Sequence, residues 1–179
     1  ESVYWVFTQL CNDECDHCYN SSGPRGERIS TEDCLRIVDN LPARIDRLIL
    51  SGGEPLADRK KFYAILEKLE ARYQGAVEIM VQTNGDLLTE QRLREMIDLG
   101  VTRFDIASID RYHKKAGARL EKLRDLFASQ GVYTEKDPLI KKENYVRGKR
   151  LTWGYWGATE DMWLGGNWAR GRALEKDNW

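Results

Sequence analysis

Three cysteines lie within eight residues of one another near the start of the chain, in the segment Cys11-Asn-Asp-Glu-Cys15-Asp-His-Cys18. The spacing C-x3-C-x2-C is too tight for a disulfide framework spread over several loops. In a reducing compartment such a triplet favours thiolates that bind a metal ion or an iron-sulfur cluster. We therefore predict that Cys11, Cys15 and Cys18 are metal ligands.

The number of available thiolates helps to distinguish between the possible kinds of metal site. A structural zinc site prefers four closed ligands, and here His17 or the distant His113 would have to supply the fourth. Cys34 falls on the apolar face of a predicted helix, so we predict that it packs in the core. A [4Fe-4S] cluster held by three thiolates leaves one iron open for an external ligand, whereas a ferredoxin-like electron carrier normally provides four cysteines per cluster.

The elements that must position this loop follow a repeated pattern of strand, polar or glycine turn, and helix. Apolar runs predict strands over residues 3–10, 47–50, 77–81 and 101–109. Helical spacing of apolar residues, with caps at Ser30 or Thr31 and at Thr89, predicts a helix after each strand, the last over residues 119–130. Repeated strand-helix units form parallel sheets with right-handed crossovers. The predicted fold is α/β, a partial (βα) barrel of parallel strands with its site at the strands' C-terminal ends.

The rest of the chain departs from this pattern. We expect residues 1–132 to form the core and residues 133–150, with six basic against three acidic residues, to form a basic connection or a degenerate fifth unit. Residues 151–179 should contain the last strand, over 151–156, and a tail rich in tryptophan. That tail would plug the open side of the sheet, line a cleft or lead toward an auxiliary domain. The start at Glu1, without a methionine, is consistent with a part of a longer protein.

The charge composition of the chain argues against two classes of binding partner. The 28 basic and 29 acidic residues give a net charge of -1, which argues against nucleic acid and a membrane surface as partners. The sequence contains neither an apolar window long enough to cross a membrane nor a basic signal segment at the N-terminus. We expect a soluble, cytoplasmic protein.

Taken together, the cysteine loop after the first strand and Gly52-Gly53-Glu54-Pro55 after the second resemble the radical S-adenosylmethionine (SAM) enzymes. The resemblance extends over about residues 3 to 131 and includes a polar segment, Ser108-Ile109-Asp110, after the fourth strand. It implies one [4Fe-4S] cluster whose open iron is chelated by SAM. Reductive cleavage of SAM would release methionine and a deoxyadenosyl radical that removes hydrogen from a substrate.

The resemblance also implies roles for single residues. His17 would stack near the adenine, and Gly52 and Gly53 would form a turn whose backbone approaches SAM closely. Glu54 would complement the SAM amino group, directly or by ordering the turn. Ser108 would meet the ribose, and Arg119 would pair with the SAM carboxylate unless it is an ordinary helix-surface arginine.

Further polar residues are predicted at the same rim. Gln82, Thr83 and Asn84 end the third strand and could face SAM or substrate. Asp110 and His113 are candidates for substrate contact or proton transfer, although a single histidine near a helix start is more often a surface residue.

The resemblance implies an external electron donor, such as a flavodoxin or ferredoxin, and a peptide or small-molecule substrate. Residues 165–173 resemble the Gly-Arg-Ala segment that precedes auxiliary iron-sulfur ligands in members with a SPASM or Twitch extension. No cysteine follows Cys34, so such an extension would lie outside this chain. A zinc-binding interaction module is the non-enzyme alternative, and it would leave Gly52-Gly53-Glu54 unexplained.

Overall fold

The computed structural model describes residues 1–110, 112–113, 116–134, 136, 142–157 and 170–176. Its centre is one sheet in which all five strands run parallel in the order β1-β2-β3-β4-β7. The strands are β1 (Ser2–Val6), β2 (Arg47–Ser51), β3 (Glu78–Thr83), β4 (Val101–Ile106) and β7 (Thr152–Tyr155). The predicted α/β fold of parallel strands is confirmed.

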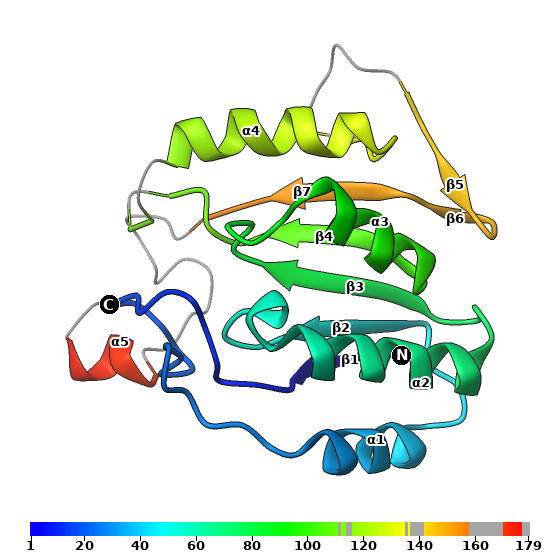
Figure 1. Cartoon of the computed structure of the whole chain (residues 1–179), viewed down its shortest axis with the longest axis horizontal. Helices are drawn as coiled ribbons and strands as arrows, with labels where there is room; N and C mark the ends of the chain where they lie inside the picture. Colours follow the sequence, from blue (N-terminus) through cyan, green and yellow to red (C-terminus); the bar gives the residue numbers. More distant parts are fainter. Residues whose placement is uncertain (111, 114–115, 135, 137–141, 158–169, 177–179) are drawn as a thin grey trace.

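Helices follow the first four strands, as the sequence predicts (Figure 1). Ser30 caps the first helix by accepting from the backbone N–H of Asp33, and Thr89 caps the third in the same way. The helices are α1 (Thr31–Asn40), α2 (Arg59–Tyr73), preceded by the 3₁₀ turn η1 (Pro55–Asp58), α3 (Glu90–Asp98) and α4 (Ala116–Ser129).

Apolar side chains from the strands and helices form one core. Phe7 stacks on Phe62 at a centroid distance of 5.7 Å, and Trp153 stacks on Phe127 at 4.7 Å. Of the tryptophan-rich tail, Trp153 is thus a core residue. Trp156 is partly exposed, while Trp163, Trp168 and Trp179 lie outside the described residues.

Two predicted strands are shorter than expected. β1 ends at Val6 rather than at residue 10, because Thr8 and Leu10 leave the sheet to bridge Arg28 and Gly23. β4 ends at Ile106 rather than at residue 109. Both corrections lengthen the polar connections at the same rim of the sheet.

The basic segment 133–150 contains a short antiparallel hairpin of β5 (Tyr145–Val146) and β6 (Lys149–Arg150). Its turn places Arg147 and Gly148 at positive φ, the conformation that a two-residue hairpin turn requires. Within the described part of this segment there is no helix. Among the described residues of this segment, the hairpin of β5 and β6 is what precedes β7.

The described C-terminal residues return to the first loop of the chain. The short helix α5 (Arg172–Glu175) lies at the side toward which the strand arrowheads point, beside the loop that follows β1 (Figure 1). In the described part of the chain, no helix is both long and apolar enough to cross a membrane.

Candidate active site

The cysteine loop begins where β1 leaves the sheet. The backbone N–H of Cys11 donates to the carbonyl of Gly23, and that of Gly23 donates to Gln9, so the two ends of the loop are tied together. Inside the loop, the N–H of Cys18 donates to the carbonyl of Cys15 at 3.2 Å. The loop thus presents its three cysteines from one closed turn.

The three thiols are shielded from solvent to different degrees. Cys11 is buried, while Cys15 and Cys18 are half-buried, and none is in a disulfide. Burial, as the main cause, raises the pKa of Cys11 to about 11 and that of Cys15 to about 12. A bound cation would be needed to hold such thiols as thiolates near neutral pH.

The sulfur environment fits an iron-sulfur cluster. The Sγ of Cys11 accepts from the backbone N–H of Asp13 at 3.4 Å, and the Sγ of Cys18 accepts from that of Ser22 at 3.3 Å. Hydrogen bonds of this kind stabilise thiolate sulfur and help set the potential of a bound cluster. Cys34 is fully buried against α2 within the core, which confirms the prediction that it packs there.

The glycine turn packs directly against the start of the cysteine loop. The N–H of Gly53 donates to the carbonyl of Thr8, and that of Glu54 donates to Leu10. A Cβ on Gly53 would stand 2.4 Å from the Leu10 oxygen and 2.9 Å from the Cys11 Cβ. In this structure, the close approach that requires glycine is therefore made to the chain's own backbone.

Glu54 orders the turn from inside the protein. Its side chain is fully buried and accepts from Leu56 N–H, Asn84 N–H and the Thr83 hydroxyl, the last at 2.7 Å. Burial outweighs these hydrogen bonds and raises the pKa of Glu54 to about 7. Of the two predicted roles, these contacts fit the ordering of the turn.

Asn84 connects the ends of three strands to the cysteine loop. Its N–H binds Glu54 after β2, and its carbonyl accepts from Ser108 Oγ after β4 at 2.6 Å. Its Nδ2 donates to Asn12 Oδ1 at 3.0 Å and lies 4.0 Å from Cys11 Sγ. Ser108 itself is fully buried, so its hydroxyl is already engaged within the protein.

Arg119 faces this rim rather than solvent. Its Nη1 donates to the Ser108 carbonyl at 3.2 Å and its Nη2 pairs with Asp86 at 2.8 Å. The side chain is only 12% exposed, so the alternative of an ordinary surface arginine is wrong. Gln82 and Thr83 have other partners: the Thr83 hydroxyl donates to Glu54, and Gln82 accepts from Ser51 Oγ.

The side chains of His17 and His113 lie close to each other and to Cys15. The rings of His17 and His113 are 5.0 Å apart, and His17 also lies 5.0 Å from Tyr112. His113 is buried, with Nδ1 at 2.7 Å from Asp110 Oδ1 and Nε2 at 3.5 Å from Cys15 Sγ. The expectation of a surface histidine at position 113 is therefore wrong, because the turn capped by Asp110 directs its ring inward.

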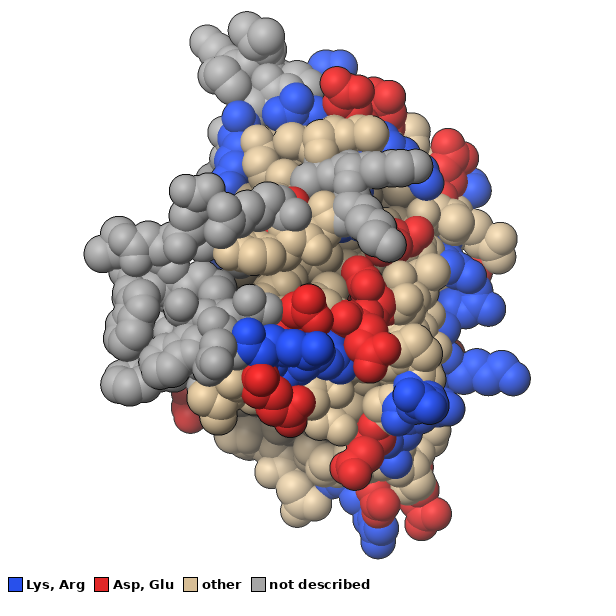
Figure 2. Space-filling view, turned by 90° about the vertical axis from the view of Figure 1, so that its left-hand side faces the viewer, with Lys and Arg blue, Asp and Glu red and all other residues tan. Residues whose placement is uncertain are grey.

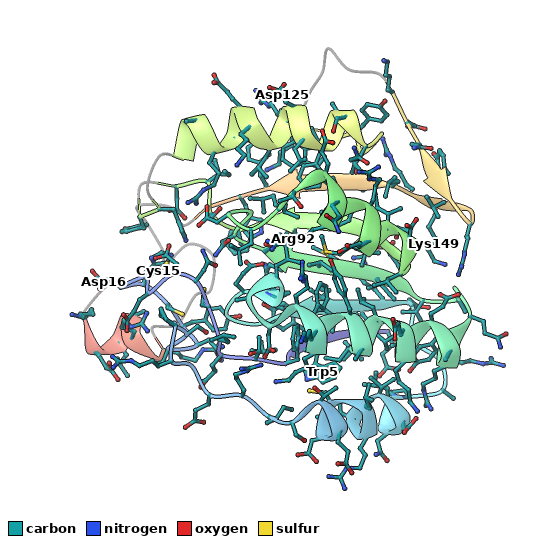
Figure 3. The ribbon with its side chains drawn as sticks, in the orientation of Figure 1. Trp5, Cys15, Asp16, Arg92, Asp125 and Lys149 are labelled. Carbon is teal, nitrogen blue, oxygen red and sulfur yellow. The ribbon has the colours of Figure 1, made fainter. Side chains whose placement is uncertain are left out.

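One contact set was not foreseen from the sequence. Arg172, only 12% exposed, donates Nη1 to the Cys15 carbonyl at 2.7 Å and Nη2 to the Ser22 carbonyl at 2.6 Å. The N–H of Ala173 donates to the Cys18 carbonyl, and a Cβ on Gly171 would lie 2.6 Å from the Tyr19 oxygen. Figure 3 shows the labelled Cys15 and Asp16 beside α5. The Gly-Arg-Ala motif in the sequence marked this segment as notable. It did not indicate that the segment contacts the cysteine loop.

Figure 2 shows the molecule from the side of this rim, where acidic and basic side chains lie next to one another.

Comparison with known proteins shows the family of the chain. The profile described as "Radical SAM superfamily" matches residues 5–125, well over half of the chain. The chain belongs to the radical SAM superfamily. Members of this superfamily are enzymes that use a [4Fe-4S] cluster and SAM. These two groups are thus the cofactors of this chain, which is a radical SAM enzyme.

A curated protein is also similar to part of this chain. The chain is 26% identical over 104 residues to a GTP 3',8-cyclase of Rhizobium leguminosarum bv. trifolii (strain WSM2304), a match that covers 56% of this chain and 30% of the relative. The matched region therefore spans about a third of the length of that curated relative.

Two solved structures are similar to parts of this chain. One, a tagged form of anSMEcpe with bound AdoMet, is similar at a TM-score of 0.51 and 17% identity over 72% of this chain and 40% of that one. Another, BtrN in complex with AdoMet and 2-DOIA, has a TM-score of 0.49 and 24% identity over 68% of this chain and 54% of that one. The likeness to anSMEcpe indicates a shared fold.

Proposed function

We propose that this chain cleaves SAM reductively at a [4Fe-4S] cluster and uses the resulting radical to remove hydrogen from a substrate. Cys11, Cys15 and Cys18 would hold the cluster, and the bound cofactors would supply the radical chemistry. The observation that carries the proposal is the junction of the cysteine loop with the glycine turn, where Gly53 and Glu54 bind the backbone of Thr8 and Leu10.

The protein's own residues would orient SAM and shield the site. Glu54, buried beneath the turn, fixes the ends of β2 and β3 relative to each other. Arg119 would offer its guanidinium to the SAM carboxylate, sharing it with Asp86. His17, beside Tyr112, would stack near the adenine. Ser108 would act from beneath the ribose by holding Asn84 and Arg119 in place.

A SAM-cleavage assay tests this function. After anaerobic reconstitution with iron and sulfide and reduction with dithionite, the wild-type chain should release 5'-deoxyadenosine and methionine in equal amounts. Alanine at any one of Cys11, Cys15 or Cys18 should abolish the release, and Cys34→Ala should retain it because Cys34 packs in the core. Undiminished cleavage by the Cys15→Ala variant would contradict the ligand assignment.

For the substrate, we propose a peptide. The support is the spacing of eleven residues from Ser108 to Arg119, at which peptide-modifying members commonly have an arginine, together with the Gly-Arg-Ala segment, which resembles that of members with a cysteine-rich extension. A small molecule is the second candidate, favoured by the match to a GTP 3',8-cyclase. The electron donor we propose is a flavodoxin or ferredoxin, and the site of action is the cytoplasm.

Deuterium transfer distinguishes the two substrate classes. A pool of uniformly deuterated tryptic peptides and, separately, deuterated GTP would each be incubated with the reduced enzyme and SAM. Deuterium in the 5'-deoxyadenosine from the peptide pool alone would support the peptide proposal. Deuterium from GTP alone would contradict it and favour the second candidate.

A further inference from the structure

Beside the three-cysteine arrangement lies a second, different grouping of metal-binding side chains. The ligand atoms of Cys15, His17 and His113 all lie within 4.8 Å of one another. Cys11 and Cys18 are not part of this group. One sulfur and two imidazole nitrogens thus converge from two separate parts of the chain, the cysteine loop and the turn before α4.

The dimensions of this group suit a single tetrahedral ion. With Zn–S near 2.3 Å and Zn–N near 2.0–2.1 Å, tetrahedral ligation places sulfur about 3.6 Å from nitrogen. The Sγ of Cys15 already lies 3.5 Å from Nε2 of His113. Because no separation within the group exceeds 4.8 Å, a small side-chain rotation is enough to close it around one ion.

The outer contacts of His113 are also those of a metal ligand. Its Nδ1 lies 2.7 Å from Asp110 Oδ1, which fixes the tautomer and leaves Nε2 directed at Cys15. A histidine that binds a metal almost always donates its other ring nitrogen to such a carboxylate. The Asp110 oxygen is itself held by the N–H groups of Tyr112 and His113, so the pair is oriented in advance.

We propose that, in the chain without its cluster, Cys15, His17 and His113 bind one divalent ion of the zinc class. Thiolate and imidazole are both ligands that suit zinc, and three protein ligands leave a fourth position for water. Because Cys15 cannot bind both metal centres at once, binding of zinc and assembly of the iron-sulfur cluster would exclude each other. This mutual exclusion rests on the proposed function.

Metal titration of the full chain tests the binding. The anaerobic, reduced, cluster-free protein would be titrated with Zn²⁺ by calorimetry and with Co²⁺ as a spectroscopic probe. We expect one ion per chain, with intense visible bands of tetrahedral Co²⁺ and a thiolate-to-cobalt charge-transfer band. His113→Ala and His17→Ala should each weaken Zn²⁺ binding by at least about 100-fold, and Asp110→Asn by about 10- to 100-fold.

Matched cysteine variants identify the ligand set. Cys15→Ser should remove the charge-transfer band, whereas Cys11→Ser and Cys18→Ser should keep it, because neither sulfur belongs to the group. Circular dichroism would verify that each variant is folded, and His113→Gln would replace His113→Ala if the latter is not. Zinc binding that survives both histidine substitutions but disappears with Cys11→Ser or Cys18→Ser would overturn the proposal, as would the absence of binding to the folded wild type.

Competition separates this inference from the proposed function. Reconstitution with iron and sulfide after one equivalent of Zn²⁺ should lower the cluster yield of the wild type several-fold, and should do so much less in His113→Ala. Zinc binding without any cluster formation would contradict the proposed function and leave the zinc site standing. A cluster that cleaves SAM in a chain that binds no zinc would overturn the zinc site alone.

Discussion

The glycine turn and the cysteine loop adjoin each other, yet the protein stabilises them in different ways. The turn is held from within the sheet: Glu54 is fully buried and its partners, Thr83 and Asn84, end the neighbouring strand. The loop is held from outside by residues far along the chain, with Arg172 on its carbonyls and His113 beside Cys15.

This difference has a functional consequence. The part of the site assigned to SAM is built together with the hydrophobic core, so it should persist whenever the protein folds. The part assigned to the cluster depends on long-range polar contacts, which can be lost while the sheet remains intact. Substitutions in the two regions should therefore separate global stability from cluster binding.

The largest effect is expected at Gly53. Alanine there would place its Cβ 2.4 Å from a backbone oxygen, a clash that no side-chain rotation relieves. We expect a loss of about 3 kcal/mol or more in the free energy of unfolding, measured by urea denaturation, with loss of the cluster. Gly117→Ala is the control, because nothing lies within 4 Å of its added Cβ. Equal stability of the two variants would contradict the tight junction.

Glu54→Gln should have the next largest effect. An amide nitrogen cannot accept from the N–H groups that bind the carboxylate, so we expect a loss of about 1–3 kcal/mol in unfolding free energy. The exposed Glu67→Gln on α2 should change stability by less than about 0.5 kcal/mol. If both substitutions have equally small effects, Glu54 does not hold the turn.

The same carboxyl group gives a pH dependence. Burial raises the pKa of Glu54 from 4.5 to about 7, so the folded state binds more protons than the unfolded chain between these values. The contribution of Glu54 to stability should therefore fall by roughly 1 kcal/mol per pH unit as pH rises through this window, and level off above it. Urea unfolding at several pH values should show a shallower slope in Glu54→Gln, and identical slopes would be evidence against this titration.

Arg172→Met tests the loop without disturbing the core. Loss of two charge-assisted hydrogen bonds should weaken the loop by about 2 kcal/mol and lower the iron bound per chain, while urea unfolding of the sheet changes little. Arg172→Lys should restore binding only in part, because lysine lacks the planar fork. Arg170→Met is the control, since Arg170 is exposed and lies over the Tyr19 ring. Equal iron content in all variants would contradict the role given to Arg172.

The smallest effect is expected at Arg119. Because Arg119 already pairs with Asp86, its truncation should weaken SAM binding by about tenfold, or 1.4 kcal/mol. Lysine should recover part of this loss, and alanine at the exposed Arg124 of the same helix should leave SAM affinity unchanged. Calorimetric titration of the reconstituted variants decides this, and an unaltered affinity in Arg119→Ala would remove Arg119 from the SAM site.

The sequence predicted the features that depend on local patterns. The repeated strand-helix units, the caps at Ser30 and Thr89, and the burial of Cys34 follow from short-range spacing and hydrophobicity. The predicted end of β1 was wrong because Thr8 and Leu10 form backbone bridges with Arg28 and Gly23 outside the sheet, which overrides their β-propensity. The predicted end of β4 was also too late, since the strand ends at Ile106.

The contacts within the candidate site were harder to predict from the sequence. Arg172 lies 157 residues from Cys15, and His113 lies 98 residues from it, so no local pattern links them. The burial of Ser108 and Glu54 was also hidden, because only the packed rim shows that their polar atoms are directed inward.

The proposed function depends on three cysteines that hold a [4Fe-4S] cluster with one iron open to SAM. The most direct measurement is the electron paramagnetic resonance spectrum of the reconstituted, reduced protein before and after addition of SAM. We expect a reduced [4Fe-4S] signal that shifts when SAM binds, and that is absent after substitution of Cys11, Cys15 or Cys18. A signal that SAM leaves unchanged, or one that persists in the Cys15→Ala variant, would contradict it.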